Sequence, residues 1–140
     1  MPPSILTATL DAIESERVDL SFDRSFDLVD RLLVEFGEAD LAERLHVAIP
    51  IERPWEVVAD LFGILTWSTR DNGSALMRAT DDWLRAGDDV RKIQIALNMD
   101  HYPFFDRSEM ETVLATVASR HPEVAAKCGE LIESRRKSSE

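Results

Sequence analysis

Residues 54–65 read Pro-Trp-Glu-Val-Val-Ala-Asp-Leu-Phe-Gly-Ile-Leu, and this stretch decides the fold. Pro54 suits the first turn of a helix, because the backbone N–H that proline lacks has no partner there. Apolar side chains then recur at three- and four-residue spacing, so they share one helical face. That face comprises Trp55, Val58, Leu61, Phe62 and Leu65, and Val57 and Ile64 widen it. The sequence therefore predicts a helix at the centre of a core.

The same helical spacing recurs on both sides of this stretch, from Leu6 to Ile132. Short connections between the segments favour antiparallel packing of neighbouring helices. We therefore expect an all-α, single-domain bundle of about six or seven antiparallel helices. The domain is predicted to span residues 1–134, and the polar tail at 135–140 is predicted to be frayed.

Residues 93–99 fit two kinds of secondary structure. Apolar side chains occupy every second position, which is typical of a strand. The segment also follows Asp88 and Asp89, which can cap a helix, and it is long for a strand. We favour a helix that is buried on two sides, and a short strand remains the alternative.

The chain is acidic, and the excess charge is uneven. Its 140 residues carry a net charge of −11, of which residues 1–53 contribute 12 acidic and 5 basic groups. Such a field repels nucleic-acid phosphates and anionic membrane surfaces. It attracts a basic protein and speeds its association at low salt. We expect a basic protein partner, no direct nucleic acid and no membrane; acidity that serves only solubility is the alternative.

The sequence favours a cytoplasmic protein. Cys128 is the single cysteine, so no internal disulfide can form, which fits a reducing compartment. The first residues lack the basic start and apolar run of a signal peptide. No apolar stretch approaches the roughly 18 residues that a membrane span requires.

Catalytic and metal-binding patterns are missing from the sequence. His46, His101 and His121 lie far apart, and Cys128 falls on an apolar helical stripe. No glycine-rich phosphate loop is present. We therefore expect no catalytic residue, no cofactor and no metal.

The segment most suited to function is a loop at residues 100–106, which reads Asp-His-Tyr-Pro-Phe-Phe-Asp. Aromatic side chains among acids are the composition of an interface core with a polar rim. One of Phe104 and Phe105 is expected to fold back as a plug, which leaves the other and Tyr102 partly exposed. Acids at nearby helix ends complete the predicted surface. The predicted protein-binding residues are Asp100, His101, Tyr102, Phe104, Phe105, Asp106, Asp81, Asp82, Asp88 and Asp89.

These features favour an acidic protein-binding module. In its sharpest form it is an immunity or antitoxin protein that neutralises a basic toxin by covering its active surface. Residues 100–103 resemble the acid–aromatic–proline segment of colicin-type immunity proteins, over four residues only, and no residue role follows from that resemblance. An enzyme with a helical site around Asp100 and His101, and a non-catalytic subunit of a larger assembly, are the alternatives.

Overall fold

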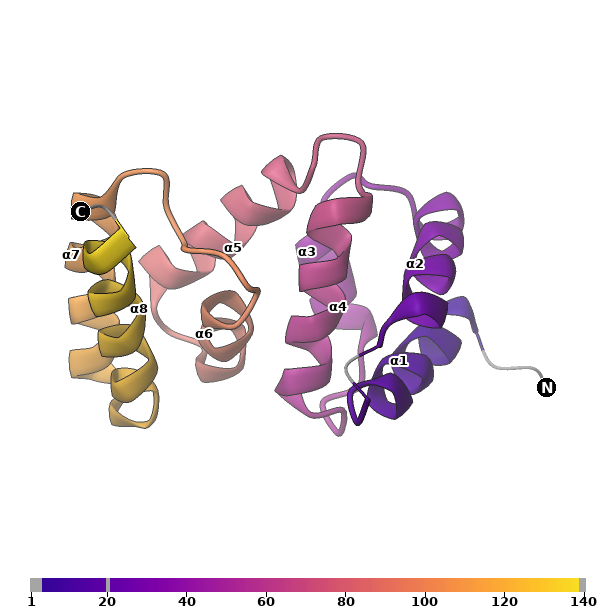
Figure 1. Cartoon of the computed structure of the whole chain (residues 1–140), viewed down its shortest axis with the longest axis horizontal. Helices are drawn as coiled ribbons and strands as arrows, with labels where there is room; N and C mark the ends of the chain where they lie inside the picture. The colour runs from indigo at the N-terminus through magenta and orange to yellow at the C-terminus, as the bar shows by residue number, and fades with distance from the viewer. Residues whose placement is uncertain (1–3, 20, 139–140) are drawn as a thin grey trace. The chain divides into compact units, whose positions relative to one another are not determined.

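The computed structural model describes residues 4–19 and 21–138, and within them the chain is helical and contains no strand (Figure 1). The predicted all-α fold is confirmed. The strand alternative for residues 93–99 is wrong, because α6 covers most of that segment. The helices are α1 (Ile5–Glu16), α2 (Asp23–Phe36), α3 (Leu41–Ala48), α4 (Trp55–Ser68), α5 (Ser74–Ala86), α6 (Val90–Leu97), α7 (Arg107–Arg120), the 3₁₀ turn η1 (Pro122–Val124) and α8 (Ala125–Ser138).

The chain divides into two compact units, Met1–Leu76 and Met77–Glu140. The prediction of one domain over residues 1–134 stays a prediction.

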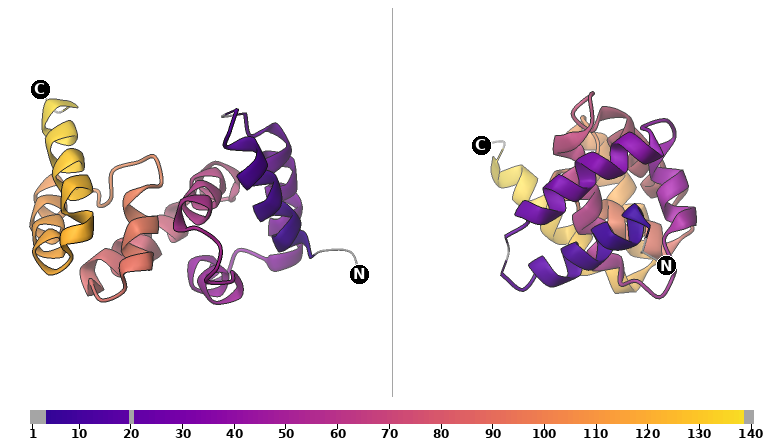
Figure 2. Two further views of the ribbon diagram at one scale, coloured as in Figure 1. Left: turned by 90° about the horizontal axis from the view of Figure 1, so that it is seen from below. Right: turned by 90° about the vertical axis from the view of Figure 1, so that its right-hand side faces the viewer.

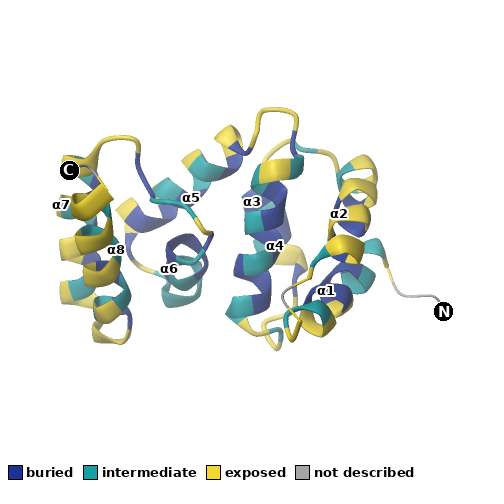
Figure 3. Cartoon of the chain, viewed as in Figure 1, coloured by how far each residue is buried: buried dark blue, intermediate teal, exposed yellow. Residues whose placement is uncertain are grey.

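In the first unit, α4 supplies the core, as the sequence predicts. Its apolar face is buried, and both α1 and α2 pack against it and against each other (Figures 1 and 3). The carboxylate of Glu16, at the end of α1, accepts hydrogen bonds from the Ser25 hydroxyl at 2.5 Å and the Ser25 N–H at 2.7 Å. The hydroxyl bond is the main reason why the pKa of Glu16 is lowered. Because Ser25 lies at the start of α2, this contact joins the two helices in antiparallel order (Figure 2).

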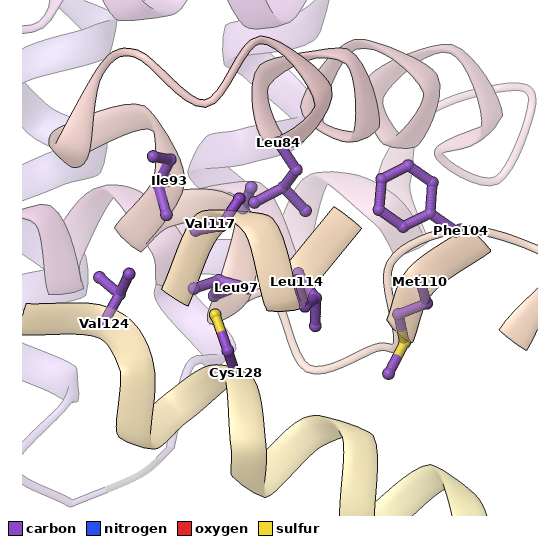
Figure 4. Close-up of a cluster of buried hydrophobic side chains, with 10 residues drawn as sticks. Leu84, Ile93, Leu97, Phe104, Met110, Leu114, Val117, Val124 and Cys128 are labelled. Carbon is purple, nitrogen blue, oxygen red and sulfur yellow. The ribbon is translucent and has the colours of Figure 1, made fainter. Parts of the chain in front are cut away.

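In the second unit, α7 and α8 form an antiparallel pair joined by η1 (Figures 1 and 2). The pair encloses a core to which α5, α6 and the loop before α7 also contribute. Figure 4 shows this core, with Phe104 and Met110 toward one end and Val124 toward the other. Its buried members are Leu84, Ile93, Ala96, Leu97, Phe104, Met110, Leu114, Val117, Val124 and Cys128.

The C-terminal segment is helical where fraying was expected. Helix α8 continues to Ser138, and Arg135 and Arg136 make hydrogen bonds to other parts of the second unit. Arginine partners outside the helix contact its last turns, and the expected fraying of residues 135–140 stays a prediction. Residues 139–140 lie outside the described residues.

Among the described residues, no helix combines the length and apolarity that crossing a bilayer would demand.

Two glycines are expected to respond oppositely to replacement by alanine. Gly73 has φ +80°, and a Cβ there would lie 2.7 Å from the Thr66 Cα, so Gly73→Ala forces the backbone to shift. Gly129 lies exposed in α8, and a Cβ there would meet no atom within 4 Å. Urea unfolding should show Gly73→Ala less stable by about 2 kcal/mol or more. It should show Gly129→Ala more stable by about 0.5–1 kcal/mol, since alanine favours a helix. A Gly73→Ala variant as stable as the parent would contradict the close approach of Gly73 to Thr66 of α4.

Candidate protein-binding site

The loop between α6 and α7 turns sharply at two residues. Asp100 has φ +62° and Phe104 has φ +64°, a region that residues other than glycine seldom adopt. The Phe104 N–H donates to Oδ1 of Asp81 on α5 at 3.1 Å, which supports the second turn. The surrounding structure therefore imposes this backbone path.

Phe104 is the plug of the loop. Its side chain is buried in the core of the second unit, and the Arg85 Cζ lies 4.8 Å from the ring centroid. The expectation that one phenylalanine folds back is met by this residue. The Phe104 side chain lies inside the core and presents little surface to a partner, and its role in protein binding stays a prediction.

Phe105 is the exposed phenylalanine of the pair. Its relative exposure is 102 %, so its side chain makes almost no contact within the chain. Its backbone is nevertheless fixed, because the Phe105 carbonyl accepts a hydrogen bond from Nη2 of Arg135 at 2.6 Å. The positive φ at Phe104 turns the chain between the two rings, so one points into the core and the other into solvent.

Arg135 on α8 holds the loop through three successive carbonyls. Its Nη1 donates to the Pro103 oxygen at 3.1 Å and the Phe104 oxygen at 2.9 Å, and its Nη2 donates to Phe105. Its Cζ also lies 5.6 Å from the centroid of the Tyr102 ring. Arg135 was not predicted as a site residue, because it lies in a polar tail that was expected to fray. No apolar residue follows Ile132, so helical spacing gave no signal there.

Tyr102 is half-buried and ties the loop to the same helix. Its hydroxyl lies 2.5 Å from the Ser134 Oγ and 3.5 Å from the Ser138 Oγ. The Ser134 hydrogen bond is the main cause that lowers the pKa of Tyr102. Tyr102 is partly exposed as predicted, but its hydroxyl also links the loop to α8 through the two serines.

Three of the predicted acids serve the fold. Asp106 caps α7 by accepting from the N–H groups of Ser108 at 3.3 Å and Glu109 at 3.2 Å. Asp89 caps α6 by accepting from the N–H of Lys92 at 3.1 Å. Asp81 accepts from the loop, and burial raises its pKa above the ordinary value.

The remaining predicted acids lie on the surface. Asp82 pairs with Arg85 at 2.7 Å, and the same guanidinium donates to both oxygens of Glu109 at 3.2 Å. Asp88 and Asp100 are exposed. The exposed charges of the predicted set are therefore Asp82, Asp88, Asp100 and Asp106.

A groove of about 500 Å³ lies beside the loop. Asp100 and His101 both line it, and the His101 Nδ1 lies 3.3 Å from the Met99 oxygen. The full lining is Leu97, Asn98, Asp100, His101, Tyr102, Lys127 and Leu131. It carries no serine, threonine or cysteine that could act as a nucleophile. Cys128, which follows the lining residue Lys127, is buried. Burial raises the pKa of its thiol to about 11, so little of the reactive thiolate forms.

Within residues 4–19 and 21–138, no three His, Cys, Asp or Glu side chains gather as a metal would require. The expected absence of metal and cofactor stays a prediction.

The tryptophans differ in exposure. Trp83 is buried, whereas Trp67 is 80 % exposed on α4 of the first unit.

Comparison of the chain with protein-family models, curated proteins and solved structures found no match.

Loss of the Arg135 guanidinium should loosen the loop. In Arg135→Ala, three carbonyls lose a charged donor, so we expect a loss of unfolding free energy of about 1.5–3 kcal/mol. Arg136→Ala is the matched control, since Arg136 pairs with Glu111 at an exposed position on the same helix. Exposed pairs contribute little, and we expect a change below about 1 kcal/mol there. Urea denaturation compares the two variants, and equal losses would show that the loop does not depend on Arg135.

The stability of Asp81→Asn relative to the parent should depend on pH. Burial raises the pKa of Asp81 above 3.8, so folding favours its protonated form. The stability that protonated Asp81 contributes to the parent is fully present below the unfolded-state pKa and is lost as pH rises through the folded-state pKa. The amide oxygen of asparagine can still accept from the Phe104 N–H, without a buried charge. The variant should therefore gain stability over the parent at about pH 7, and the gain should vanish near about pH 3.

Urea unfolding at both pH values measures this difference. Asp82→Asn, which removes an exposed carboxylate at the next position, is the control for a simple loss of charge. An Asp81→Asn variant whose relative stability falls as pH rises would contradict the argument.

Proposed function

We propose that this chain is an acidic protein-binding module that presents Phe105 to a basic partner. Two features of Phe105 carry the proposal. Its side chain is fully exposed, and its backbone carbonyl is held by a hydrogen bond from Arg135. In its specific form, the module is an immunity or antitoxin protein of the cytoplasm. It would cover the active surface of a toxin domain and would perform no catalysis itself.

An exposed phenylalanine on a fixed loop is suited to serve as a binding anchor. Burial of such a side chain in a partner's pocket contributes about 1.5–3 kcal/mol. Much of the cost of association is the ordering of flexible groups. Arg135 donates hydrogen bonds to this loop and Asp81 accepts one from it, so the loop is ordered before any partner arrives. A larger share of the burial energy is therefore available for affinity.

The charge of the chain supports a basic partner. Asp100 lies within the loop and is exposed, and the whole chain carries −11. Such a field raises the rate of encounter with a basic surface, and the effect weakens with salt. A toxin that cleaves nucleic acid has a basic active surface, which an acidic module can cover.

The experiment uses a basic toxin domain encoded beside the gene for this chain. Co-expression should restore growth to cells that produce the domain, and Phe105→Ala should lose that protection. Titration calorimetry should show Phe105→Ala binding the domain at least about tenfold more weakly, since central aromatic anchors dominate binding energy. Val34→Ala is the matched control, because Val34 is an apolar residue of the first unit with 85 % exposure.

Association of the parent with the domain should slow as salt rises. A neighbouring gene product that is not toxic would overturn the immunity form of the proposal. Unchanged affinity in Phe105→Ala would overturn the role of the loop.

A further inference from the structure

The first unit exposes a run of apolar residues where α3 ends. Val47 is 82 % exposed and Ile51 is 77 % exposed, and Ala48 and Pro50 between them are also exposed. Figure 3 shows the loop that enters the lower end of α4 as exposed. Runs of exposed apolar residues are unfavourable on a protein surface unless another molecule covers them.

This run is held in place by its neighbours. Ile49, in its middle, is buried and anchors the segment to the first unit. The Arg53 N–H donates to the Pro50 oxygen at 3.0 Å and closes a turn. The Arg53 guanidinium, 19 % exposed, pairs with Asp11 and with Glu14 of α1, each at 2.6 Å. The apolar side chains therefore project from an ordered backbone.

Acidic side chains border the run. Asp11 and Glu14 keep 59 % and 41 % of their side chains exposed, and Glu52 is exposed next to Ile51. Arg53 offsets only part of this charge. An apolar centre with an acidic border is complementary to apolar side chains set among lysine or arginine. A second copy of this chain would bring the same acidic border and a charge of −11, so repulsion disfavours it.

We propose that residues 47–52, the α3-end surface, form a second protein-binding surface whose occupant is a protein segment with apolar side chains among basic ones. This surface lies in the first unit and does not depend on the Phe105 loop. Val47 and Ile51 supply the apolar contacts, and Asp11, Glu14 and Glu52 select the basic partner.

The test uses the full chain and a synthetic amphipathic helical peptide of leucine and lysine. A peptide of the same pattern with glutamate in place of lysine is its control. Amide NMR signals of residues 47–53 should shift with the lysine peptide and stay unchanged with the glutamate peptide. The double variant Val47→Ser with Ile51→Ser should weaken binding by about tenfold. The matched control Val18→Ser with Val34→Ser replaces residues of equal type, 84 % and 85 % exposed, and should change affinity less than about twofold.

Neither double variant alters charge, so the comparison separates apolar contact from electrostatic attraction. Shifts that map elsewhere, or equal binding by both double variants, would overturn the proposal. Sedimentation velocity that shows dimers of the parent, abolished by Val47→Ser with Ile51→Ser, would also overturn it and assign the surface to a second copy. Phe105→Ala should leave peptide binding at the α3-end surface unchanged, so a failure here is distinct from a failure of the loop.

Discussion

The candidate site depends on the hydrogen bonds that the Arg135 guanidinium donates to the loop. The guanidinium donates to three consecutive carbonyls, of Pro103, Phe104 and Phe105, which no regular secondary structure would satisfy. Charge-assisted hydrogen bonds are stronger than neutral ones, and one planar group serves all three acceptors. The loop can therefore keep a positive φ at Phe104, with one ring in the core and the next in solvent. The structure of the site follows from this contact between residues 30–32 apart in sequence.

The acids of the second unit divide into two groups by what they contact. Asp81, Asp89 and Asp106 accept backbone N–H groups, so they stabilise the loop and the starts of α6 and α7. Asp88 and Asp100 face solvent. The acidity of this region therefore has two purposes: three carboxylates stabilise the backbone, and the exposed carboxylates, Asp106 among them, are open to a partner. Steering of a basic partner depends on the field of the whole chain more than on a local acidic cluster.

The sequence predicted well what local rules determine. The broad apolar face of residues 54–65 placed α4 in a core, and Pro54 marked its start. The sequence also predicted that one phenylalanine of the loop would be buried. Helical spacing does not say which one, because the choice depends on the positive φ at Phe104 and on Asp81, which is 23 residues away. Arg135 was missed for the same reason. An arginine near a chain end resembles a solvated tail until the acceptors that surround it are known.

The central claim is that the Phe105 loop is ordered before any partner binds. Backbone ¹⁵N relaxation of the free protein tests it most directly, through the order parameters of Phe104 to Asp106. The account predicts values close to those of the flanking helices, about 0.8 or higher, despite the full exposure of the Phe105 ring. Values below about 0.6 would show a flexible loop and would contradict the account.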